Sequence, residues 1–141
     1  MRRYRLGPAR RAANVAVKGL IRTGLVPKEL HLLTTRGRRT GRLYSTPVNL
    51  VLDGDRRWLV APYGVVSWVH NARAAERVTL TRRGRSEEVA VTELGPQDAA
   101  PVLKRYVENV AIVRPYFDAR PDDPPEAFVG DVADHPVFRL G

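Results

Sequence analysis

The chain has 141 residues, 43% of them hydrophobic and 28% charged, a size and balance that fit one ordinary globular domain. Its formal net charge of +9 favours an anionic partner: nucleic acid, an anionic membrane surface, or a phosphorylated or carboxylated small molecule. The lack of cysteine excludes disulfides, thiolate metal sites and cysteine nucleophiles. No apolar run has the length of a membrane span, and the basic N-terminus lacks an Ala-x-Ala cleavage site, so we expect a cytoplasmic protein.

The first predicted element is an amphipathic helix over residues 8–24, which sets a segment 1–27 apart from a second unit over 28–141. Its apolar side comprises Ala9, Ala13, Ala16, Val17, Leu20 and Gly24, whereas Arg11, Asn14, Lys18 and Arg22 lie opposite. A cationic amphipathic helix can make a weak peripheral contact with the inner membrane face. Because alanine anchors poorly in lipid, packing of this helix on the rest of the protein is the favoured interpretation.

Short strands joined by hairpins follow from residue 29 onward. The pattern predicts strands over 29–35, 44–53, 57–62, 77–82, 86–94 and 135–140. Asp53-Gly54 and Arg83-Gly84-Arg85 provide residues that tolerate the positive φ of tight hairpins. Because hairpins join antiparallel neighbours, we predict an α+β protein that is mainly β, an antiparallel barrel with flanking helices.

Two helices and one irregular segment complete the prediction. The first helix covers residues 67–75 with Ser67 as its N-cap, and the second opens at Gly95-Pro96 and runs to about Val110. Four prolines between Arg114 and Pro125 predict an irregular surface loop.

Several catalytic signatures do not occur in the sequence. There is no Gly-x-Gly-x-x-Gly, no Walker-type Gly-Lys-Thr and no Gly-x-Ser-x-Gly. His31, His70 and His135 lie far apart without ligand spacing, so we expect structural hydrogen-bonding roles for them and no metal site. No pair of carboxylates is placed for acid–base work, which argues against a hydrolase.

Residues 36–42, which we name the arginine turn, contain four arginines, two glycines and Thr40. Glycine lets backbone N–H groups approach an anion, and the guanidinium fork of arginine matches phosphate oxygens. Four like charges so close together repel one another unless they are solvated or neutralised by a ligand. The turn is therefore either a phosphate-binding site or an exposed, solvated hairpin tip.

A second candidate region runs from Pro62 to Arg73, where a strand end passes through a glycine-containing loop into a helix. Unpaired N–H groups and the helix dipole favour an anion at such a helix start. Tyr63 and Trp68 provide flat surfaces and Arg73 a further cation. Trp68 can also be a core anchor, and the two roles are compatible.

Together these segments resemble the deazaflavin-dependent nitroreductase family over roughly residues 28–141. The resemblance is carried by residues 32–41 (LLTTRGRRTG), Thr46-Pro47-Val48, residues 68–73 (WVHNAR) and residues 135–140 (HPVFRL). It implies a split β-barrel cofactor-binding domain, commonly a homodimer, that binds coenzyme F420. The reduced coenzyme of that family passes a hydride to an electrophilic acceptor such as an activated alkene, a quinone or a nitro compound.

The resemblance also implies roles for particular residues. Arg39, with Arg38, Thr40 and Gly41, matches the loop that faces the phosphate and acidic tail of the cofactor. Thr46, Pro47 and Val48 match the strand along the deazaflavin ring, and Gly64 and Trp68 match the loop and helix start over it. Two departures stand out: Leu43-Tyr44 replaces a common Pro-Arg, and the segment before Trp68 is short. Phosphate contacts are therefore expected to shift to Arg42, Arg73 or backbone N–H groups.

The source of the substrate proton stays open at this point. Tyr63, Tyr116 and Tyr44 are candidate catalytic donors, and solvent is an equal contender. Acceptor specificity is expected to come from Tyr116, Phe117 and the proline-rich loop. The alternatives are an FMN-binding split-barrel oxidoreductase, a non-enzymatic basic barrel that binds nucleic acid or anionic membrane, and a barrel that binds F420 without efficient turnover.

Overall fold

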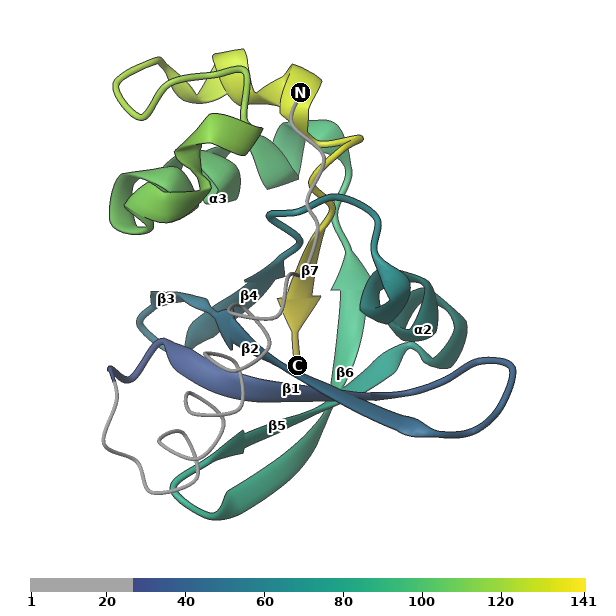
Figure 1. The fold of residues 1–141 in the computed structure, drawn as a ribbon. Helices are drawn as coiled ribbons and strands as arrows, with labels where there is room; N and C mark the ends of the chain where they lie inside the picture. The colour runs from purple at the N-terminus through teal and green to yellow at the C-terminus, as the bar shows by residue number, and fades with distance from the viewer. Residues whose placement is uncertain (1–26) are drawn as a thin grey trace.

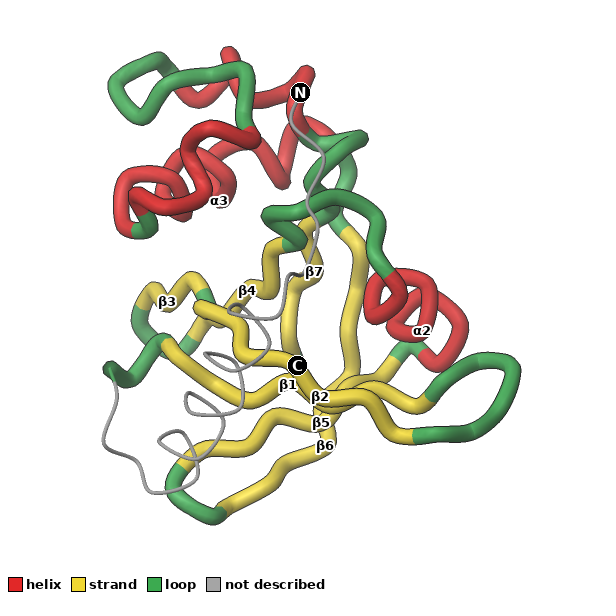
Figure 2. Tube along the Cα trace, in the orientation of Figure 1, coloured by secondary structure: helices red, strands yellow, loops and turns green. Residues whose placement is uncertain are grey.

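The computed structural model describes residues 27–141 (Figure 1). The helix predicted over residues 8–24, and with it the division of the chain at residue 27, lies outside the described residues. A curled antiparallel sheet forms the body of the described part, with α2 at one side and a helical layer at one end (Figure 2). The prediction of a mainly β, antiparallel split barrel with flanking helices is confirmed.

Seven strands form this sheet in the order β2-β1-β5-β6-β7-β4-β3, and every neighbouring pair is antiparallel. The strands are β1 (Leu30–Arg36), β2 (Leu43–Asn49), β3 (Val51–Asp53), β4 (Arg56–Val60), β5 (Arg77–Arg82), β6 (Arg85–Glu93) and β7 (Val137–Leu140). The β3–β4 turn has Gly54 at φ +62°, as the Asp53-Gly54 pair predicts.

The strand predicted over 44–53 is wrong as a single element, because it breaks at Leu50 into β2 and β3. The Leu50 amide makes the last bond toward β1, 2.8 Å from the Glu29 carbonyl oxygen. The next residue, Val51, pairs with Trp58 of β4 instead. Since β2 and β3 are the two ends of the strand order, this bend brings the ends of the sheet together and curls it into a split barrel.

Within residues 27–141, two α-helices and two 3-10 helices flank the sheet: α2 (Ser67–Ala75), α3 (Pro96–Asn109), η1 (Ala111–Tyr116) and η2 (Pro125–Asp131). The N-cap of α2 is Val66, with extended backbone and no side-chain cap, so the assignment of Ser67 as N-cap is wrong by one residue. The surface loop predicted over residues 114–125 is also only partly right, because both of its ends form 3-10 turns.

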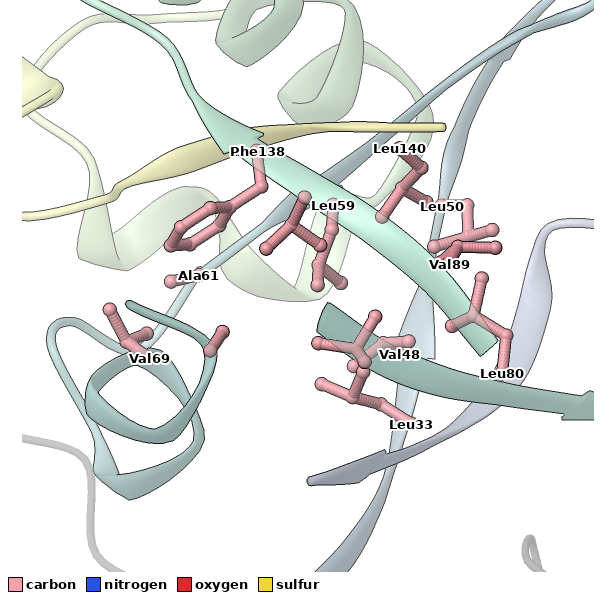
Figure 3. Packing of buried hydrophobic residues seen from close by; sticks show 13 residues of the cluster. Leu33, Val48, Leu50, Leu59, Ala61, Val69, Leu80, Val89, Phe138 and Leu140 are labelled. Atoms are coloured by element: carbon pink, nitrogen blue, oxygen red, sulfur yellow. The ribbon is translucent and has the colours of Figure 1, made fainter. Parts of the chain in front are cut away.

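Two apolar clusters hold these layers together. The first fills the inside of the curled sheet beside α2, where Phe138 lies near Leu59 and Ala61, and Leu33 lies near Val48 (Figure 3). The second lies between the sheet and the α3 layer and includes Val60 and Leu103. Leu59 and Val60 are adjacent and both fully buried, so β4 is covered on its two faces.

The pH dependence of stability should report the environment of His31 on β1. Burial of its ring, aided by the positive charges of Arg82 and Arg57, lowers the pKa of His31 from 6.5, against a raising contact with the Glu29 carbonyl. The folded state therefore resists protonation of the His31 ring. Stability is fully present above about pH 6.5 and declines as the pH falls through that value toward the folded pKa. Thermal unfolding of the His31→Gln variant should depend less on pH between about 7.5 and 5.5; an unchanged pH response would contradict this assignment.

Candidate functional site

The arginine turn is a closed hairpin end that extends beside α2 (Figure 1). The Gly37 amide donates to the Arg42 carbonyl at 2.6 Å, and the Gly41 amide donates to the Gly37 carbonyl at 2.9 Å. Thr40 accepts the Arg42 amide through Oγ1 at 3.2 Å, so its hydroxyl already has a structural partner. Gly41 has φ +74°, which a side chain would strain. The glycines and Thr40 thus shape the turn and leave the arginine side chains on its outside.

A buried amide on α2 anchors this turn. Oδ1 of Asn71, a residue only 2% exposed, accepts the Arg38 backbone N–H at 3.2 Å and its Nη1 at 3.1 Å. The Asn71 Nδ2 donates to Oγ1 of Thr35 at 3.2 Å. One side chain therefore fixes both β1 and the turn that follows it against the helix. Sequence reasoning missed this residue; a polar side chain beside Val69 and Ala72 on the buried face of α2 was the available signal.

The cations of the turn lack acidic partners among the described residues. Arg36 donates from Nη1 to the Gly41 carbonyl at 3.0 Å, and Arg38 is bound to Asn71. No ion pair within residues 27–141 involves these two or Arg39 and Arg42. Elsewhere several surface arginines of the sheet are paired, as Arg57 with Glu87 and Arg77 with Glu88, whereas Arg85 and Arg139 have no ion pair in the same range of residues. The turn is thus a concentrated positive charge whose counter-ion is not supplied by the described part of the chain.

Thr46, Pro47 and Val48 lie on β2, which ends the strand order and leaves one edge without a strand neighbour in the described sheet. At the two ends of the β1–β2 ladder, backbone hydrogen bonds join Gly37 to Arg42 and Glu29 to Leu50. By the alternation of an antiparallel ladder, Pro47 opposite Leu32 is in a non-hydrogen-bonded pair. Its ring nitrogen, which has no hydrogen, faces the open edge, so proline costs the ladder nothing here.

The loop between β4 and α2 brings two aromatic groups to separate places. Tyr63 meets Tyr116 of η1 edge to face, with ring centroids 5.2 Å apart and planes at 83°. Trp68 is half-buried and lies 6.0 Å from the ring of Phe138, so it is part of the core and partly exposed. Gly64 between them has φ +99°, a left-handed conformation that favours glycine. The first turn of α2 has no acidic residue and no side-chain cap, which leaves its positive end uncompensated.

Three residues expected at the site, Arg73, Tyr44 and Phe117, each make a contact that bears on the expected role. Arg73 is committed to an ion pair, with Nε and Nη2 each 2.8 Å from an oxygen of Glu93, and this bonding raises the pKa of Arg73. Tyr44 is 50% exposed at the turn, where a Cβ on Gly37 would meet its ring at 2.9 Å. Phe117, expected to shape the acceptor pocket, is instead buried and stacked on His135, which leaves Tyr116 as the accessible aromatic of that segment.

The remaining histidines differ in burial. His135 is fully buried and His70 is exposed. No group of three or more His, Cys, Asp or Glu side chains within residues 27–141 is placed to hold a metal ion. Neither α2 nor α3 combines the length and apolar composition that a bilayer crossing requires.

Comparison with known proteins places the chain in a family. Residues 9–120 match the family model described as F420H(2)-dependent quinone reductase. A search of curated proteins finds no match. Among solved structures, an F420-H2 dependent reductase (FDR-A) is 20% identical, with a TM-score of 0.57 over 82% of this chain and 96% of that chain.

Two further structures share the fold. A protein described as a domain-swapped dimer is 18% identical, with a TM-score of 0.58 over 96% of this chain and all of that one (100%). A putative pyridoxamine 5'-phosphate oxidase from Listeria innocua is 8% identical, with a TM-score of 0.54 over 90% of this chain and 88% of that chain. At these identities the likeness establishes the split-barrel fold.

Removal of the Asn71 amide should release the arginine turn from α2. The Asn71→Ala variant leaves the Arg38 amide and the Thr35 hydroxyl without their partner, so the free energy of unfolding should fall by about 1–3 kcal/mol. Urea unfolding measures this loss, and His70→Ala on the exposed side of the same helix is the matched control. Equal effects of the two variants would show that the amide does not anchor the turn.

Proposed function

The chain belongs to the family of F420H2-dependent quinone reductases, and on that premise we propose that the arginine turn holds the acidic part of coenzyme F420. Arg39 and Arg42 are exposed cations without a described carboxylate partner, and the amide of Asn71 holds Arg38 beside them. A phosphodiester with an oligoglutamate tail supplies the negative charge that this turn lacks. The residues present therefore fit the cofactor, with Gly41 and Thr40 shaping the turn rather than donating to the ligand.

We assign the open edge of β2 and the β4–α2 loop to the ring system of the cofactor. Thr46 and Pro47 are partly exposed on an edge to which a flat ligand has access, because no described strand pairs along it, and the buried Val48 supports this edge from the core. Gly64 has no side chain to block a close approach, and the partly exposed face of Trp68 offers a flat apolar surface. The uncompensated start of α2 supports a negative group near this loop.

Arg73 is the weakest member of the proposed cofactor set. Its guanidinium has two hydrogen bonds to Glu93, so a phosphate contact would have to replace or share that ion pair. Arg42, which makes no side-chain ion pair in the described chain, is the better substitute for the cation that Leu43-Tyr44 removes.

Bound F420H2 supplies a hydride to an electrophilic acceptor, which we propose to be an activated alkene, a quinone or a nitro compound. The protein then has to orient the acceptor and provide a proton. Tyr63 and Tyr116 are the proposed contacts for the acceptor because their rings meet and both remain partly accessible. Tyr44 lies on the turn against Gly37, which makes it a contact for the acidic part of the cofactor more readily than a proton donor.

We also propose that the chain forms a homodimer. At the start of β2, before the stretch assigned to the cofactor, Leu43 at 64% and Tyr44 at 50% exposure are large exposed side chains. Such exposed apolar side chains are a surface on which a second chain can pack. The likeness to a protein described as a domain-swapped dimer supports this proposal. Light scattering on the purified protein would test it, and a monomer at micromolar concentration would contradict it.

Charge removal at the turn tests the cofactor site. The Arg39→Ala variant loses a charged hydrogen-bond donor to the acidic part of F420, so the Kd for F420 should rise about tenfold. Fluorescence polarisation of F420 measures this Kd. The Arg85→Ala variant, at the start of β6 and equally exposed, carries the same charge change and should bind as the wild type does. Saturation of the wild type by FMN without any response to F420 would contradict the proposal.

Removal of single hydroxyls tests the proton source. If Tyr116 donates the proton, Tyr116→Phe should lower kcat about 10²-fold or more with little change in the Kd for F420. Tyr63→Phe provides the same test for the other ring. Full activity of both variants would assign the proton to solvent, and F420 binding by the wild type without reduction of any acceptor would indicate a carrier.

A further inference from the structure

We propose that Asp131 and His135 are positioning residues that fix residues 116–119, the acceptor loop, and thereby set the affinity for the electron acceptor. This inference rests on the proposed function, in which Tyr63 and Tyr116 contact the acceptor. Neither Asp131 nor His135 is assigned to the cofactor or to the chemistry. Their contacts are with the backbone of the two segments that carry the tyrosines.

His135 connects those two segments directly. The ring is fully buried, with Nδ1 3.1 Å from the Ala61 carbonyl oxygen and Nε2 2.8 Å from the Tyr116 carbonyl oxygen. Ala61 lies two residues before Tyr63. The imidazole therefore lies between the backbones of the two tyrosines whose rings meet at 5.2 Å, and the tautomer decides which of the two carbonyls receives the single N–H of a neutral ring.

Asp131 fixes the residues that follow Tyr116. Its carboxylate is 3% exposed, and its two oxygens accept the backbone N–H groups of Asp118 at 2.9 Å and Ala119 at 3.0 Å. Charged acceptors make the stronger class of hydrogen bond, above all where water is excluded. The His135 amide in turn donates to the Asp131 carbonyl at 3.0 Å, so the two residues form one unit at the end of η2.

Beyond the bond from the Phe117 amide to the Arg114 carbonyl at 3.1 Å, the acceptor loop depends on support from outside it. It follows Pro115 and precedes Pro121, and it belongs to no strand and no helix after Tyr116. Its hydrogen bonds at Tyr116, Asp118 and Ala119 are the three made to the Asp131–His135 unit. Phe117 stacks on the imidazole with ring centroids 3.9 Å apart, which directs Phe117 inward and leaves the neighbouring Tyr116 at the surface. Loss of the unit would free the ring of Tyr116 without altering the arginine turn.

Two histidine variants separate positioning from general stability. His135→Gln places an amide nitrogen near the position of Nε2 and can keep the bond to Tyr116, whereas His135→Asn reaches only toward Ala61. If the ring positions the acceptor loop, the Asn variant should raise the KM for the acceptor about tenfold and the Gln variant much less. The Kd for F420 should stay within about twofold in both. A purely structural role would instead lower activity in proportion to stability, whichever amide is present.

Asp131→Asn provides a second, independent route to the same loop. One amide oxygen and one NH2 group would then face two N–H donors, so one bond is lost. The acceptor KM should again rise about tenfold, and hydrogen exchange at the Asp118 and Ala119 amides should accelerate about tenfold or more. Val78→Ala, in the barrel core on β5, is the control for lost stability and should change neither the exchange at these amides nor the acceptor KM.

The Tyr116→Ala variant distinguishes the two proposals. If it raises the acceptor KM while His135→Asn and Asp131→Asn do not, the acceptor lies where we propose and the positioning role is wrong. If Tyr116→Ala leaves the acceptor KM unchanged, the acceptor lies elsewhere, and both proposals are overturned. A raised acceptor KM in Tyr116→Ala, His135→Asn and Asp131→Asn, with faster exchange at the Asp118 and Ala119 amides in Asp131→Asn but not in Tyr116→Ala, supports the inference.

Discussion

The proposed site depends on an uncharged side chain, the amide of Asn71, that holds the positively charged arginine turn in place. Four arginines within residues 36–42 repel one another, and the turn must nevertheless keep one conformation beside α2. A carboxylate at position 71 would hold Arg38 more strongly but would also be an intramolecular counter-ion. The Asn71 amide accepts the Arg38 backbone N–H and one of its guanidinium hydrogens without neutralising the turn. The backbone is thus ordered while the positive charge remains for a ligand.

The net charge of the chain therefore indicates little about its ligand, whereas the pairing of individual arginines indicates where an anion can bind. Several arginines on the strands, and Arg73 on α2, have acidic partners, as in the pairs of Arg57 with Glu87 and Arg77 with Glu88, whereas Arg85 and Arg139 on the sheet have no ion pair in the described chain. These pairs are exposed and contribute little to stability, but they cancel charge on the sheet. The arginine turn has no such partners in the described chain. A basic surface that binds any polyanion would need its cations spread along a strand face with interleaved aromatics, which this pairing does not provide.

Local signals carried most of the fold prediction. Each hairpin with an Asp-Gly or Arg-Gly turn was found because the turn residue itself needs a positive φ, as at Gly54 and Arg83. The break at Leu50 was missed because residues 44–53 read as one β-rich run. What breaks the run is the change of partner, since Leu50 still bonds toward β1 while Val51 pairs with β4, and no residue in the run marks that change.

The site could be predicted only as far as its residues lie in continuous segments. The arginine turn, the β2 edge and the start of α2 were assigned to the proposed site from local composition and resemblance. Asn71, Asp131 and His135 were not assigned to the site because their partners lie 33, 12–13 and 19–74 residues away along the chain. Contacts between residues so far apart along the chain depend on how the barrel closes. No local sequence pattern encodes that closure.

The same physical solution appears at both ends of the proposed site. A connection that must stay exposed to meet a ligand cannot be stabilised by burying its own side chains, so its backbone is tied to a buried polar group on a rigid neighbour. Asn71 does this for the arginine turn, and Asp131 with His135 does it for the acceptor loop. Asn71 binds the Arg38 backbone and guanidinium and leaves the side chains of Arg39 and Arg42 exposed. Asp131 and His135 bind backbone atoms and leave the ring of Tyr116 accessible. This division lets the acceptor loop vary in sequence at its exposed positions while its anchors hold its path.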